Sequence, residues 1–237
     1  IALQGFSVLI LEREKSFYPL PRAVHFDDEI MRVFQTIGIA NELNPLLQVN
    51  PGMRFVDKNG RLLLDWPRPS GISPQGWNSS FRFHQPDLEK LLRKSLYKMA
   101  NVRTIIGSKV LSITQDKQGV TVELKNLTSG NFSKLTADYV VGCDGANSTT
   151  RGLMQIDMRD LGFRERWLVV DVVLKKNLSK LGDHTLQFCS SERPVTYCRS
   201  PGSRRRWEFA VLSNETDEEI TRTELIWSLL SPWILPS

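Results

Sequence analysis

Two short segments of this sequence carry residue types that could bind a nucleotide. The first is the apolar run Ser7–Leu11, which ends at the acidic residue Glu12. In dinucleotide-binding folds, an acid at the end of the second strand hydrogen-bonds the ribose hydroxyls. The glycine-rich phosphate loop that precedes such an acid by about 20 residues would fall before Ile1. Because any buried strand can end in glutamate, Glu12 alone is a weak indication of a nucleotide-binding fold.

The second segment is Val141–Ser148, with the sequence V-G-C-D-G-A-N-S. It follows the apolar residues of Ala137–Val141, which we expect to form a buried strand. Glycine at this point lets the backbone approach a pyrophosphate, and Asp144 can fix the loop or orient a cationic side chain. The alternative is an ordinary strand and turn with Asp-Gly at its tip, which is very common.

Metal, hydrolytic and disulfide chemistry are not expected. The three histidines lack the spacing of zinc ligands and have no cysteine partners, so no metal site is predicted. Ser148 does not lie in a Gly-x-Ser-x-Gly turn, which argues against a hydrolase. The three cysteines are too few and too scattered for a disulfide framework, so a reduced, cytoplasmic location is expected. The identity of a catalytic side chain stays open.

The composition is that of an ordinary globular protein, with 41% hydrophobic and 24% charged residues among 237. No apolar run approaches the ~20 residues that a membrane helix needs, so no membrane partner is expected. The net charge of +5 comes from 31 basic and 26 acidic residues. The one dense cationic cluster, Arg204–Arg206, runs into an alternating, strand-like segment. We therefore expect small anions rather than nucleic acid as the charged partners.

Helical periodicity and capping residues predict the helices. Asp27 or Asp28 can cap a helix whose apolar positions reach Ile37, after which Gly38 interrupts the pattern. Further helices are expected at Ile39–Leu47 and at Asp217–Leu230. Another helix is expected to begin at Pro86, because apolar residues follow at helical spacing as far as Met99.

Strands are predicted by alternating or short apolar runs between turn residues. Met53–Asp57 and Arg61–Trp66 flank an Asn-Gly pair, which is a strong hairpin signal. The other expected strands are Val102–Ile106, Lys109–Gln115, Val120–Lys125, Trp167–Leu174, Thr185–Phe188, Val195–Arg199 and Arg206–Leu212. These elements together predict an α/β nucleotide-binding region interleaved with an antiparallel sheet.

Nearly the whole chain resembles the class A flavoprotein aromatic hydroxylases, the group related to p-hydroxybenzoate hydroxylase and phenol hydroxylase. Val141–Ser148 is similar to the Asp-Gly motif of that group. Other segments resemble the branch of 3-(3-hydroxyphenyl)propionate hydroxylases, namely Tyr18–Glu29, Phe83–Pro86, Trp167–Val172, Arg205–Phe209 and Glu215–Glu219. These matches occur in the same order and with compatible spacing.

The resemblance implies a flavoprotein monooxygenase. FAD would be the cofactor, NADH or NADPH and molecular oxygen the co-substrates, and a phenolic aromatic acid such as 3-(3-hydroxyphenyl)propionate the compound hydroxylated. In such an enzyme the cofactor supplies the difficult chemistry, while the protein supplies binding, orientation and electrostatics.

The resemblance also implies roles for three residues near the adenosine half of FAD. Glu12 would be the ribose-binding acid, and Arg13 would lie near the adenosine. Val110 would be the strand residue whose backbone contacts the adenine. The simpler alternative for Val110 is a core strand position without a binding role.

Three further residues would contact other parts of the cofactor. Arg22 resembles the arginine that reaches the pyrophosphate region, although an arginine in a proline-rich loop can also be only solvated. Gln85 resembles the glutamine on the flavin side, with a helix cap as the alternative. Asp144 resembles the aspartate implicated in binding both FAD and the nicotinamide cofactor.

The expected fold class is α/β, with a Rossmann-like FAD-binding domain that is incomplete and interleaved with an antiparallel substrate-binding sheet. Residues 1–50 and 81–156 are assigned to a discontinuous FAD-binding domain whose N-terminal glycine loop is missing. Residues 51–80 and 157–237 are assigned to the substrate-binding domain. The hairpin at Met53–Trp66 is expected to join the later strands rather than the strand at Ser7–Leu11.

Aromatic residues of the second domain could line a substrate pocket. Trp66, Trp77, Trp167 and Trp207 are candidates for contact with an aryl ring, although protein cores use tryptophan as readily. Two arginines, Arg82 and Arg206, would suit the carboxylate tail of a phenolic acid.

Two departures from the resembled family leave alternatives open. The glycine-rich loop is missing, and the later Gly-Asp motif is missing too, because Gly182-Asp183 lies in a loop without the residues that should follow. We therefore expect an internal piece of a longer hydroxylase. The alternatives are a truncated, non-catalytic homologue that acts as a binding or interaction module, and another flavin oxidoreductase of the same fold, such as a halogenase. A homodimer is one open possibility for the oligomeric state.

Overall fold

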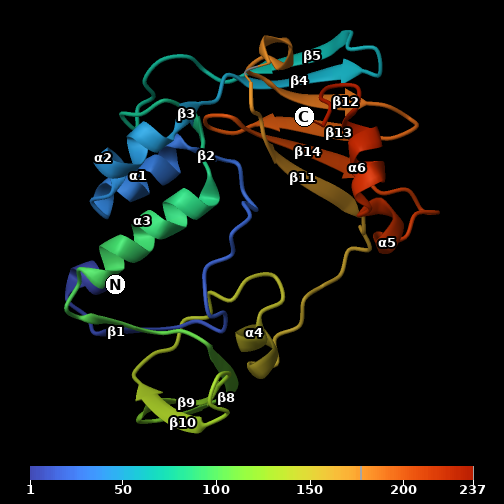
Figure 1. Ribbon diagram of the computed structural model, residues 1–237. Helices are drawn as coiled ribbons and strands as arrows, with labels where there is room; N and C mark the ends of the chain where they lie inside the picture. The colour runs from blue at the N-terminus through green and yellow to red at the C-terminus, as the bar shows by residue number, and fades with distance from the viewer. Residues whose placement is uncertain (177, 237) are drawn as a thin grey trace. The chain divides into compact units, whose positions relative to one another are not determined.

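The structure is a computed structural model that describes residues 1–176 and 178–236 (Figure 1). The chain divides into two compact units, the first formed by Ile1–Tyr18 and Arg93–Phe163, the second by Pro19–Leu92 and Arg164–Ser237. Each unit therefore combines segments that are distant in the sequence. The two units are distinguished by their internal backbone contacts, whereas the domains expected from the sequence were distinguished by the ligand that each would bind. The expected domain boundaries therefore stay a prediction.

The first unit contains two small sheets. β1 (Val8–Leu11) pairs in parallel with β7 (Val102–Ile105). An antiparallel sheet is formed by β8 (Ser108–Asp116), β9 (Gly119–Asn126) and β10 (Phe132–Ala137). Two short helices complete the unit, η1 (Ala2–Gln4) and α4 (Thr149–Leu153).

The core of the first unit lies on one face of β9. Val120, Val122 and Leu124 are buried at every second position of this strand. Alternate residues of a strand point to opposite faces, so this spacing puts all three side chains on the same side. The half-buried residues that pack against them are Leu11, Val110, Ile113 and Leu135.

The strand expected at Ala137–Val141 is wrong. The strand β10 occupies Phe132–Ala137 instead, and its ladder with β9 ends where Ala137 faces Val120. Because β9 begins one residue before Val120, the residues after Ala137 have no opposite strand in this sheet. Tyr139 is accordingly 87% exposed. An apolar run was therefore not sufficient to make a strand without a partner to accept its hydrogen bonds.

In the second unit, a small antiparallel sheet packs against helices. It has β6 (Ser80–Arg82) at its centre, between β2 (His25–Asp27) and β3 (Gln48–Val49). The helical elements of this region are α1 (Asp28–Thr36), α2 (Ala40–Leu43), η2 (Asn44–Leu46) and α3 (Gln85–Tyr97), of which the residues from Arg93 onward belong to the first unit. The buried core between sheet and helices is formed by Phe26, Met31, Ile39, Ala40, Leu43, Phe81, Phe83, Leu88 and Leu91.

The start and end of α1 agree with the sequence prediction. The Asp27 carboxylate accepts a hydrogen bond from the Ile30 backbone N–H at 3.0 Å, so Asp27 is the N-cap. After the helix, Gly38 has φ of 81°, a left-handed conformation that glycine adopts without strain. Of the apolar positions expected on this helix, Met31 is fully buried, whereas Val33 is 52% exposed.

The second unit also holds a six-stranded sheet in the order β11-β14-β13-β12-β4-β5 (Figure 1). Its strands are β4 (Gly52–Asp57), β5 (Leu62–Pro67), β11 (Trp167–Val173), β12 (Thr185–Cys189), β13 (Val195–Arg199) and β14 (Arg204–Ala210). The hairpin β4–β5 pairs with β12, which confirms that it joins the later strands rather than β1.

The expectation of a wholly antiparallel sheet is wrong at one position. β4 and β12 run parallel, with Met53 opposite Thr185. Parallel neighbours need a long connection, and the segment between these two strands includes the whole first unit apart from its N-terminal part. The local sequence of neither strand indicates that the two run parallel.

The single helix expected at Asp217–Leu230 is two helices, α5 (Asp217–Ile220) and α6 (Thr223–Leu230). Thr216 caps α5 through a reciprocal pair of hydrogen bonds with Glu219. The chain leaves the helical conformation at Arg222, whose φ of −65° and ψ of 134° are extended. Helical periodicity continues across this break, which is why it was not visible in the sequence.

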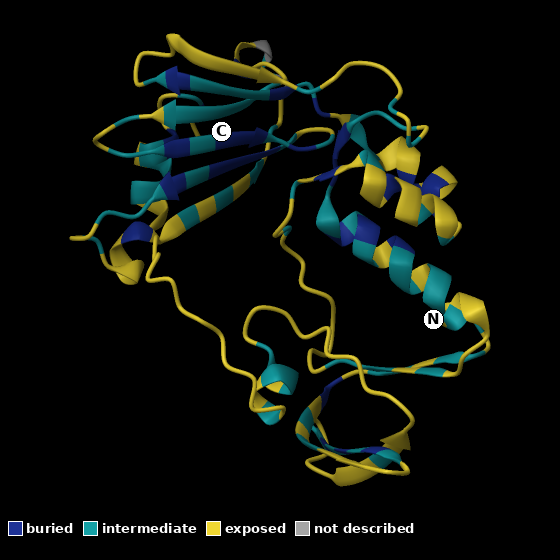
Figure 2. Cartoon of the chain, turned by 180° about the vertical axis from the view of Figure 1, so that it is seen from behind, coloured by how far each residue is buried: buried dark blue, intermediate teal, exposed yellow. Residues whose placement is uncertain are grey.

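The six-stranded sheet has one covered face and one open face. On the covered face, Trp207 and Phe209 are buried against α6 and the segment that follows it. The η3 turn (Ser179–Leu181) adds Leu181 to the same core. The neighbouring residues of β14 point to the opposite face, which we call the open face, although Arg206 on it is buried and contacts the Pro21–Arg22 loop. Along β11 exposed and half-buried residues alternate, as Figure 2 shows.

Candidate cofactor and substrate site

Glu12 lies at the carboxyl end of β1, as the sequence predicted. Its backbone N–H donates to the Ile105 carbonyl at 2.9 Å, which extends the ladder with β7 by one residue. The side-chain Oε1 accepts the Glu14 backbone N–H at 2.8 Å. This contact orients the half-buried carboxylate and leaves its second oxygen as an acceptor without a hydrogen bond among the described residues.

Arg13 and Val110 occupy two different environments in the same unit. The exposed Arg13 guanidinium pairs with Glu14 at 2.8 Å. The Val110 side chain packs against the core beside β9. Strand register shifts between Val110 and Ser112, so the intervening Leu111 has no opposite residue in β9. Such a bulge frees backbone groups for contact with another molecule.

Asp144 closes the loop that precedes α4. Its Oδ1 accepts the Ser148 hydroxyl at 2.5 Å, and its Oδ2 accepts the Thr150 backbone N–H at 2.8 Å. The Ser148 hydroxyl and the Thr150 N–H stabilise the charged carboxylate and lower the pKa of Asp144 to about 2. Asp144 therefore stays ionised at neutral pH and holds its own loop.

Glycine is required at one point of this loop and is suited to another. A Cβ at Gly142 would lie 2.8 Å from the Thr150 side chain, so the loop and α4 could not approach as closely with any other residue. Gly145 has φ of 80°, and a Cβ there would meet no atom within 4 Å. Its backbone is thus open to an approaching group.

Arg22 and Gln85, which the sequence predicted as two separate contacts of one cofactor, are in direct contact in the second unit. The Gln85 side-chain Oε1 accepts the backbone N–H of Arg22 at 2.7 Å and that of Ala23 at 3.0 Å. The side-chain oxygen of Gln85 is therefore engaged by the loop around Arg22. Gln85 fixes the backbone from which the Arg22 side chain projects.

Arg206 holds the same loop through a different set of contacts. Its guanidinium donates to the Arg22 carbonyl at 3.2 Å and also to the Pro21 carbonyl. Nε and Nη2 of the same guanidinium each lie 2.9 Å from a carboxylate oxygen of Asp171. Arg206 was predicted from the sequence to suit the carboxylate of a substrate, but in this structure its carboxylate partners are Asp171 and, at 3.7 Å, Glu208.

This arrangement could have been found only in part from the sequence. Asp171 interrupts the apolar run Leu168–Val173, and a charged residue within a strand calls for a partner. The sequence does not say which of the many cations that partner is. The register of β11 against β14 decides it, because Asp171 lies opposite Arg206.

The four tryptophans proposed to line a substrate pocket fall into three environments. Trp207 is completely buried on the covered face of the sheet, beside Tyr197 and Trp233. The indole N–H of Trp77 donates to the Gln35 side chain at 2.9 Å. Trp66 and Trp167 are 53% and 41% exposed.

Register places both exposed tryptophans on the open face. Trp167 lies on the same face of β11 as Asp171, because the two residues are an even number of positions apart, and Asp171 lies opposite Arg206 of the open face. Trp66 faces Met53, which itself faces Thr185 on β12. The open face therefore combines exposed aromatic surface with the ion pair that holds the Arg22 loop.

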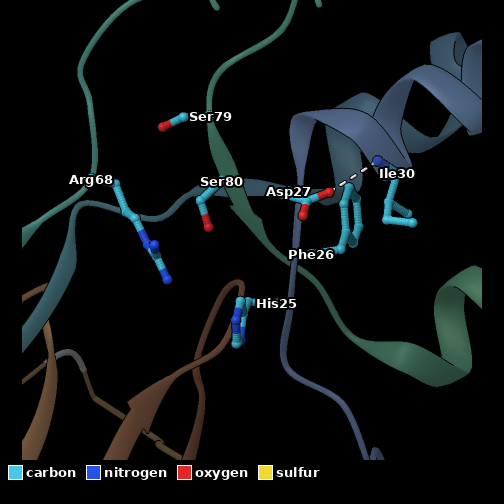
Figure 3. Close-up of a pocket in the computed structure, with 7 residues that line it drawn as sticks. All are labelled: His25, Phe26, Asp27, Ile30, Arg68, Ser79 and Ser80. Atoms are coloured by element: carbon cyan, nitrogen blue, oxygen red, sulfur yellow. Dashed lines mark hydrogen bonds between the residues drawn. The ribbon is translucent and has the colours of Figure 1, made fainter.

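A pocket with a volume of about 330 Å³ lies in the second unit (Figure 3). Its polar lining comes from His25 and Asp27 on β2, from Ser79 and Ser80, and from Arg68. Figure 3 shows the Arg68 guanidinium, the His25 imidazole and the Ser80 hydroxyl pointing into a common space. Arg68 is not among the residues predicted from the sequence to bind a ligand.

Within the described ranges, no group of three or more acidic, histidine or cysteine side chains is placed to hold a metal ion. None of the helices in the described part of the chain has the length and apolar character of a membrane-spanning segment.

A sequence profile described as an FAD binding domain matches residues 1–231 of this chain. The chain belongs to this FAD-binding domain family. The family resemblance inferred from the sequence motifs is therefore confirmed, and FAD is the cofactor that the family implies.

Curated relatives of this FAD-binding chain include named hydroxylases. A 3-(3-hydroxy-phenyl)propionate/3-hydroxycinnamic acid hydroxylase of Paraburkholderia xenovorans (strain LB400) is 33% identical over 234 residues, which cover 97% of this chain and 36% of that protein. A probable NADH-specific resorcinol 4-hydroxylase of Rhodococcus jostii (strain RHA1) is 32% identical over 239 residues, which cover 100% of this chain and 44% of that protein. The chain thus spans less than half the length of these two relatives.

Solved structures share the fold. The p-nitrophenol 4-monooxygenase of Pseudomonas putida DLL-E4 matches with a TM-score of 0.85 and 20% identity, over 99% of this chain and 58% of that one. A ternary complex of aklavinone-11 hydroxylase with FAD and aklavinone matches with a TM-score of 0.76 and 20% identity, over 97% of this chain and 46% of that one. The expected α/β fold of flavin-dependent monooxygenases is confirmed by these matches.

The donor groups of the first unit suit FAD. Glu12 presents a carboxylate oxygen of the kind that binds ribose hydroxyls. The bulge at Leu111 leaves backbone groups of the kind that contact a purine base. The open backbone at Gly145 is of the kind that approaches a pyrophosphate. The residues present in the first unit therefore fit the cofactor that the family implies.

Proposed function

We propose that this protein is a flavin-dependent monooxygenase that hydroxylates a phenolic aromatic acid such as 3-(3-hydroxyphenyl)propionate. The observation that carries the proposal is the 33% identity, over 97% of this chain, to a relative named for hydroxylation of that compound class. NADH or NADPH would be the reductant and molecular oxygen the second co-substrate.

The first unit would hold the adenosine half of FAD. In this proposal the Glu12 carboxylate accepts hydrogen bonds from the ribose hydroxyls, with Arg13 nearby, and the backbone at Val110 contacts the adenine. Asp144 would act through its loop, because both of its oxygens are already engaged by Ser148 and Thr150.

The second unit would contribute Arg22 and Gln85. A guanidinium binds an anionic diphosphate through charge-assisted hydrogen bonds, which are about twice as strong as neutral ones. Gln85 and Arg206 hold the backbone of this loop at Arg22 from two sides. They would therefore position the Arg22 side chain for contact with the cofactor.

FAD, when bound, supplies the redox and oxygen chemistry of the hydroxylation. This chain's own contribution would be to bind the cofactor and to present the open face of the six-stranded sheet to the substrate. Trp66 and Trp167 offer exposed aromatic surface on that face, which suits the ring of a phenol.

The proposed location is the cytoplasm. Two features support it: the proposed reductant is a reduced nicotinamide, and Cys143, Cys189 and Cys198 are free cysteines.

The test uses the full-length protein, purified and loaded with FAD. We expect a flavin absorbance band, and NADH or NADPH oxidation that 3-(3-hydroxyphenyl)propionate stimulates with formation of one hydroxylated product per reductant. Uncharged phenols should stimulate oxidation less. A full-length protein that binds no flavin, or that no phenol stimulates, would contradict the proposal.

A further inference from the structure

The pocket in Figure 3 is built on the polar face of the sheet formed by β2, β6 and β3. Phe81 packs into the core beneath this sheet, so its neighbours Ser80 and Arg82 point to the other side. His25 and Asp27 line the same side from β2. A volume of about 330 Å³ lies within the range of small-molecule sites, ~300–1,000 Å³.

Arg68 is one of the cations at the pocket. Its guanidinium carbon lies 5.2 Å from the centroid of the Trp66 ring, a cation–π contact that orients the half-buried side chain. Arg68 makes no ion pair with any residue that the structure describes. Its fork of donors is therefore available to a planar oxyanion, the geometry that a guanidinium matches best.

A second cation, Arg82, lies beside the pocket. Arg82 on β6 lies directly opposite His25 on β2, and it is only 2% exposed. Its Nη2 donates to the Thr185 hydroxyl at 3.3 Å, whereas the buried Nη1 has no hydrogen-bond partner. Burial lowers the pKa of Arg82 to about 10, so it is still charged at neutral pH. The buried charge has no carboxylate to balance it among the described residues.

The other titratable groups of the pocket do not offset these cations. Partial desolvation lowers the pKa of His25, and the positive charges of Arg68 and Arg82 lower it further, against the opposing effect of Asp27. His25 is therefore neutral at pH 7. Asp27 carries a negative charge, but its carboxylate is engaged by the Ile30 backbone N–H at the start of α1. Two cations against one engaged acid give the pocket a net positive character.

We propose that this pocket binds the carboxylate group of the aromatic substrate, with the Arg68 guanidinium as its main partner. The Ser80 hydroxyl and the neutral His25 imidazole line the same space and supply polar groups beside it. Arg82 contributes positive charge from beside the pocket. The identity of the substrate rests on the proposed function, but the binding of a carboxylate does not depend on catalysis. Arg68 thereby takes the place that sequence reasoning assigned to Arg206, whose carboxylate partner is Asp171.

The test measures binding to the full-length, FAD-loaded protein by calorimetry. The probes are 3-phenylpropionate and the uncharged 3-phenylpropan-1-ol, neither of which carries a ring hydroxyl. Arg68→Gln should weaken binding of the acid about tenfold, because a charge-assisted hydrogen bond is lost, and change binding of the alcohol less than twofold. Arg68→Lys, which keeps the charge without the fork, should lose less.

Arg61→Gln is the matched control, since Arg61 is an exposed arginine just before β5 that does not line the pocket. It should leave binding of both probes unchanged. Equal losses for acid and alcohol in Arg68→Gln and Arg68→Lys would overturn the proposal, because they would indicate a structural effect. Failure of the unmodified protein to bind 3-phenylpropionate would overturn it as well.

A second arm separates the two sources of an oxyanion. If Arg68 bound the 2′-phosphate of NADPH, Arg68→Gln would raise the KM for NADPH relative to NADH and spare the acid, which would overturn the proposal. Acid binding that depends on Arg68 in a protein that oxidises no nicotinamide with any phenol would instead uphold the carboxylate site and contradict the proposed function. The two failures are therefore distinguishable.

Discussion

Arg206 and Asp171 lie opposite each other on β14 and β11 and form a two-point ion pair, with both nitrogen–oxygen distances at 2.9 Å. The Arg206 side chain is 2% exposed and that of Asp171 is 27% exposed. The same guanidinium reaches the carbonyls of Pro21 and Arg22. One buried cation thus connects the open face of the sheet to the loop that we propose to bind the cofactor.

Removal of Asp171 is expected to destabilise the protein. Asp171→Ala removes the two-point carboxylate contact of the buried Arg206 guanidinium and leaves the longer contact to Glu208 at 3.7 Å; loss of one partner costs about 3–5 kcal/mol in comparable buried pairs. Asp65→Ala is the control, because Asp65 pairs with Arg54 at 3.2 Å where both side chains are about 40% exposed, and exposed pairs contribute about 0–1 kcal/mol. Urea unfolding of both variants measures the difference. Similar losses in the two would contradict the importance of the buried pair.

Gln85 is expected to affect flavin binding through the backbone of the Arg22 loop. Gln85→Leu removes the oxygen that accepts two loop N–H groups and should weaken FAD binding roughly tenfold, since two hydrogen bonds are lost. Gln85→Glu keeps an acceptor in the same place and should lose less. Flavin fluorescence during titration of the full-length apoprotein gives the affinity, with Gln118→Leu in an exposed turn as control. The prediction is wrong if Gln85→Leu and Gln85→Glu weaken FAD binding equally.

Arg22 should affect flavin binding through its side chain. Arg22→Ala leaves both backbone contacts of the loop in place, so the loop should keep its conformation. Loss of charge-assisted hydrogen bonds to a diphosphate should weaken FAD binding by about tenfold or more. The flavin titration above measures this, and Arg61→Ala serves as the exposed control. An unchanged affinity in Arg22→Ala would exclude the assignment.

The low pKa of Asp144 should depend on Ser148. Hydrogen bonds from Ser148 and then Thr150 hold this pKa near 2, against an ordinary value of 3.8. Their contribution to folding is therefore complete above the ordinary pKa and is lost as pH falls through about 2. Ser148→Ala should raise the pKa of Asp144 towards 3.8, which a carboxyl ¹³C NMR titration can follow. Ser133→Ala, on exposed β10, should leave it near 2.

Trp207 and Trp66 should respond differently to truncation. Trp207 is completely buried, so Trp207→Ala should cost about 3–5 kcal/mol of unfolding free energy. Trp66 is 53% exposed, so Trp66→Ala should cost far less. In the full-length enzyme, Trp66→Ala should raise the KM for a phenol instead. Equal destabilisation of the two variants would contradict the assignment of Trp207 to the covered face and Trp66 to the open one.

The elements that the sequence predicted well are those with local causes. The Asp27 cap of α1 depends on a contact with a residue three positions away, and Gly38 ends the same helix because of its own φ. The hairpin of β4 and β5 turns at Asn59-Gly60, where Gly60 has φ of 83°. In each case the residues that determine the conformation are neighbours in the chain.

The predictions that were wrong depended on partners elsewhere in the chain. Ala137–Val141 has the apolar character of a strand, but β9 offers it no opposite residues beyond Ala137. The parallel direction of β4 and β12 reflects a long connection rather than the composition of either strand. The break at Arg222 lies within an uninterrupted helical periodicity.

By itself, the sequence determined the family resemblance, the order of most elements, and the residues proposed to contact FAD, because these follow from residue types at short spacing. Only the tertiary structure decided that Gln85 and Arg206 hold the loop at Arg22, that Trp207 is core, and that Arg68 rather than Arg206 is available to an anion. The physical reason is that charge pairing and burial depend on strand register. A register joins residues such as Asp171 and Arg206 that no local pattern connects.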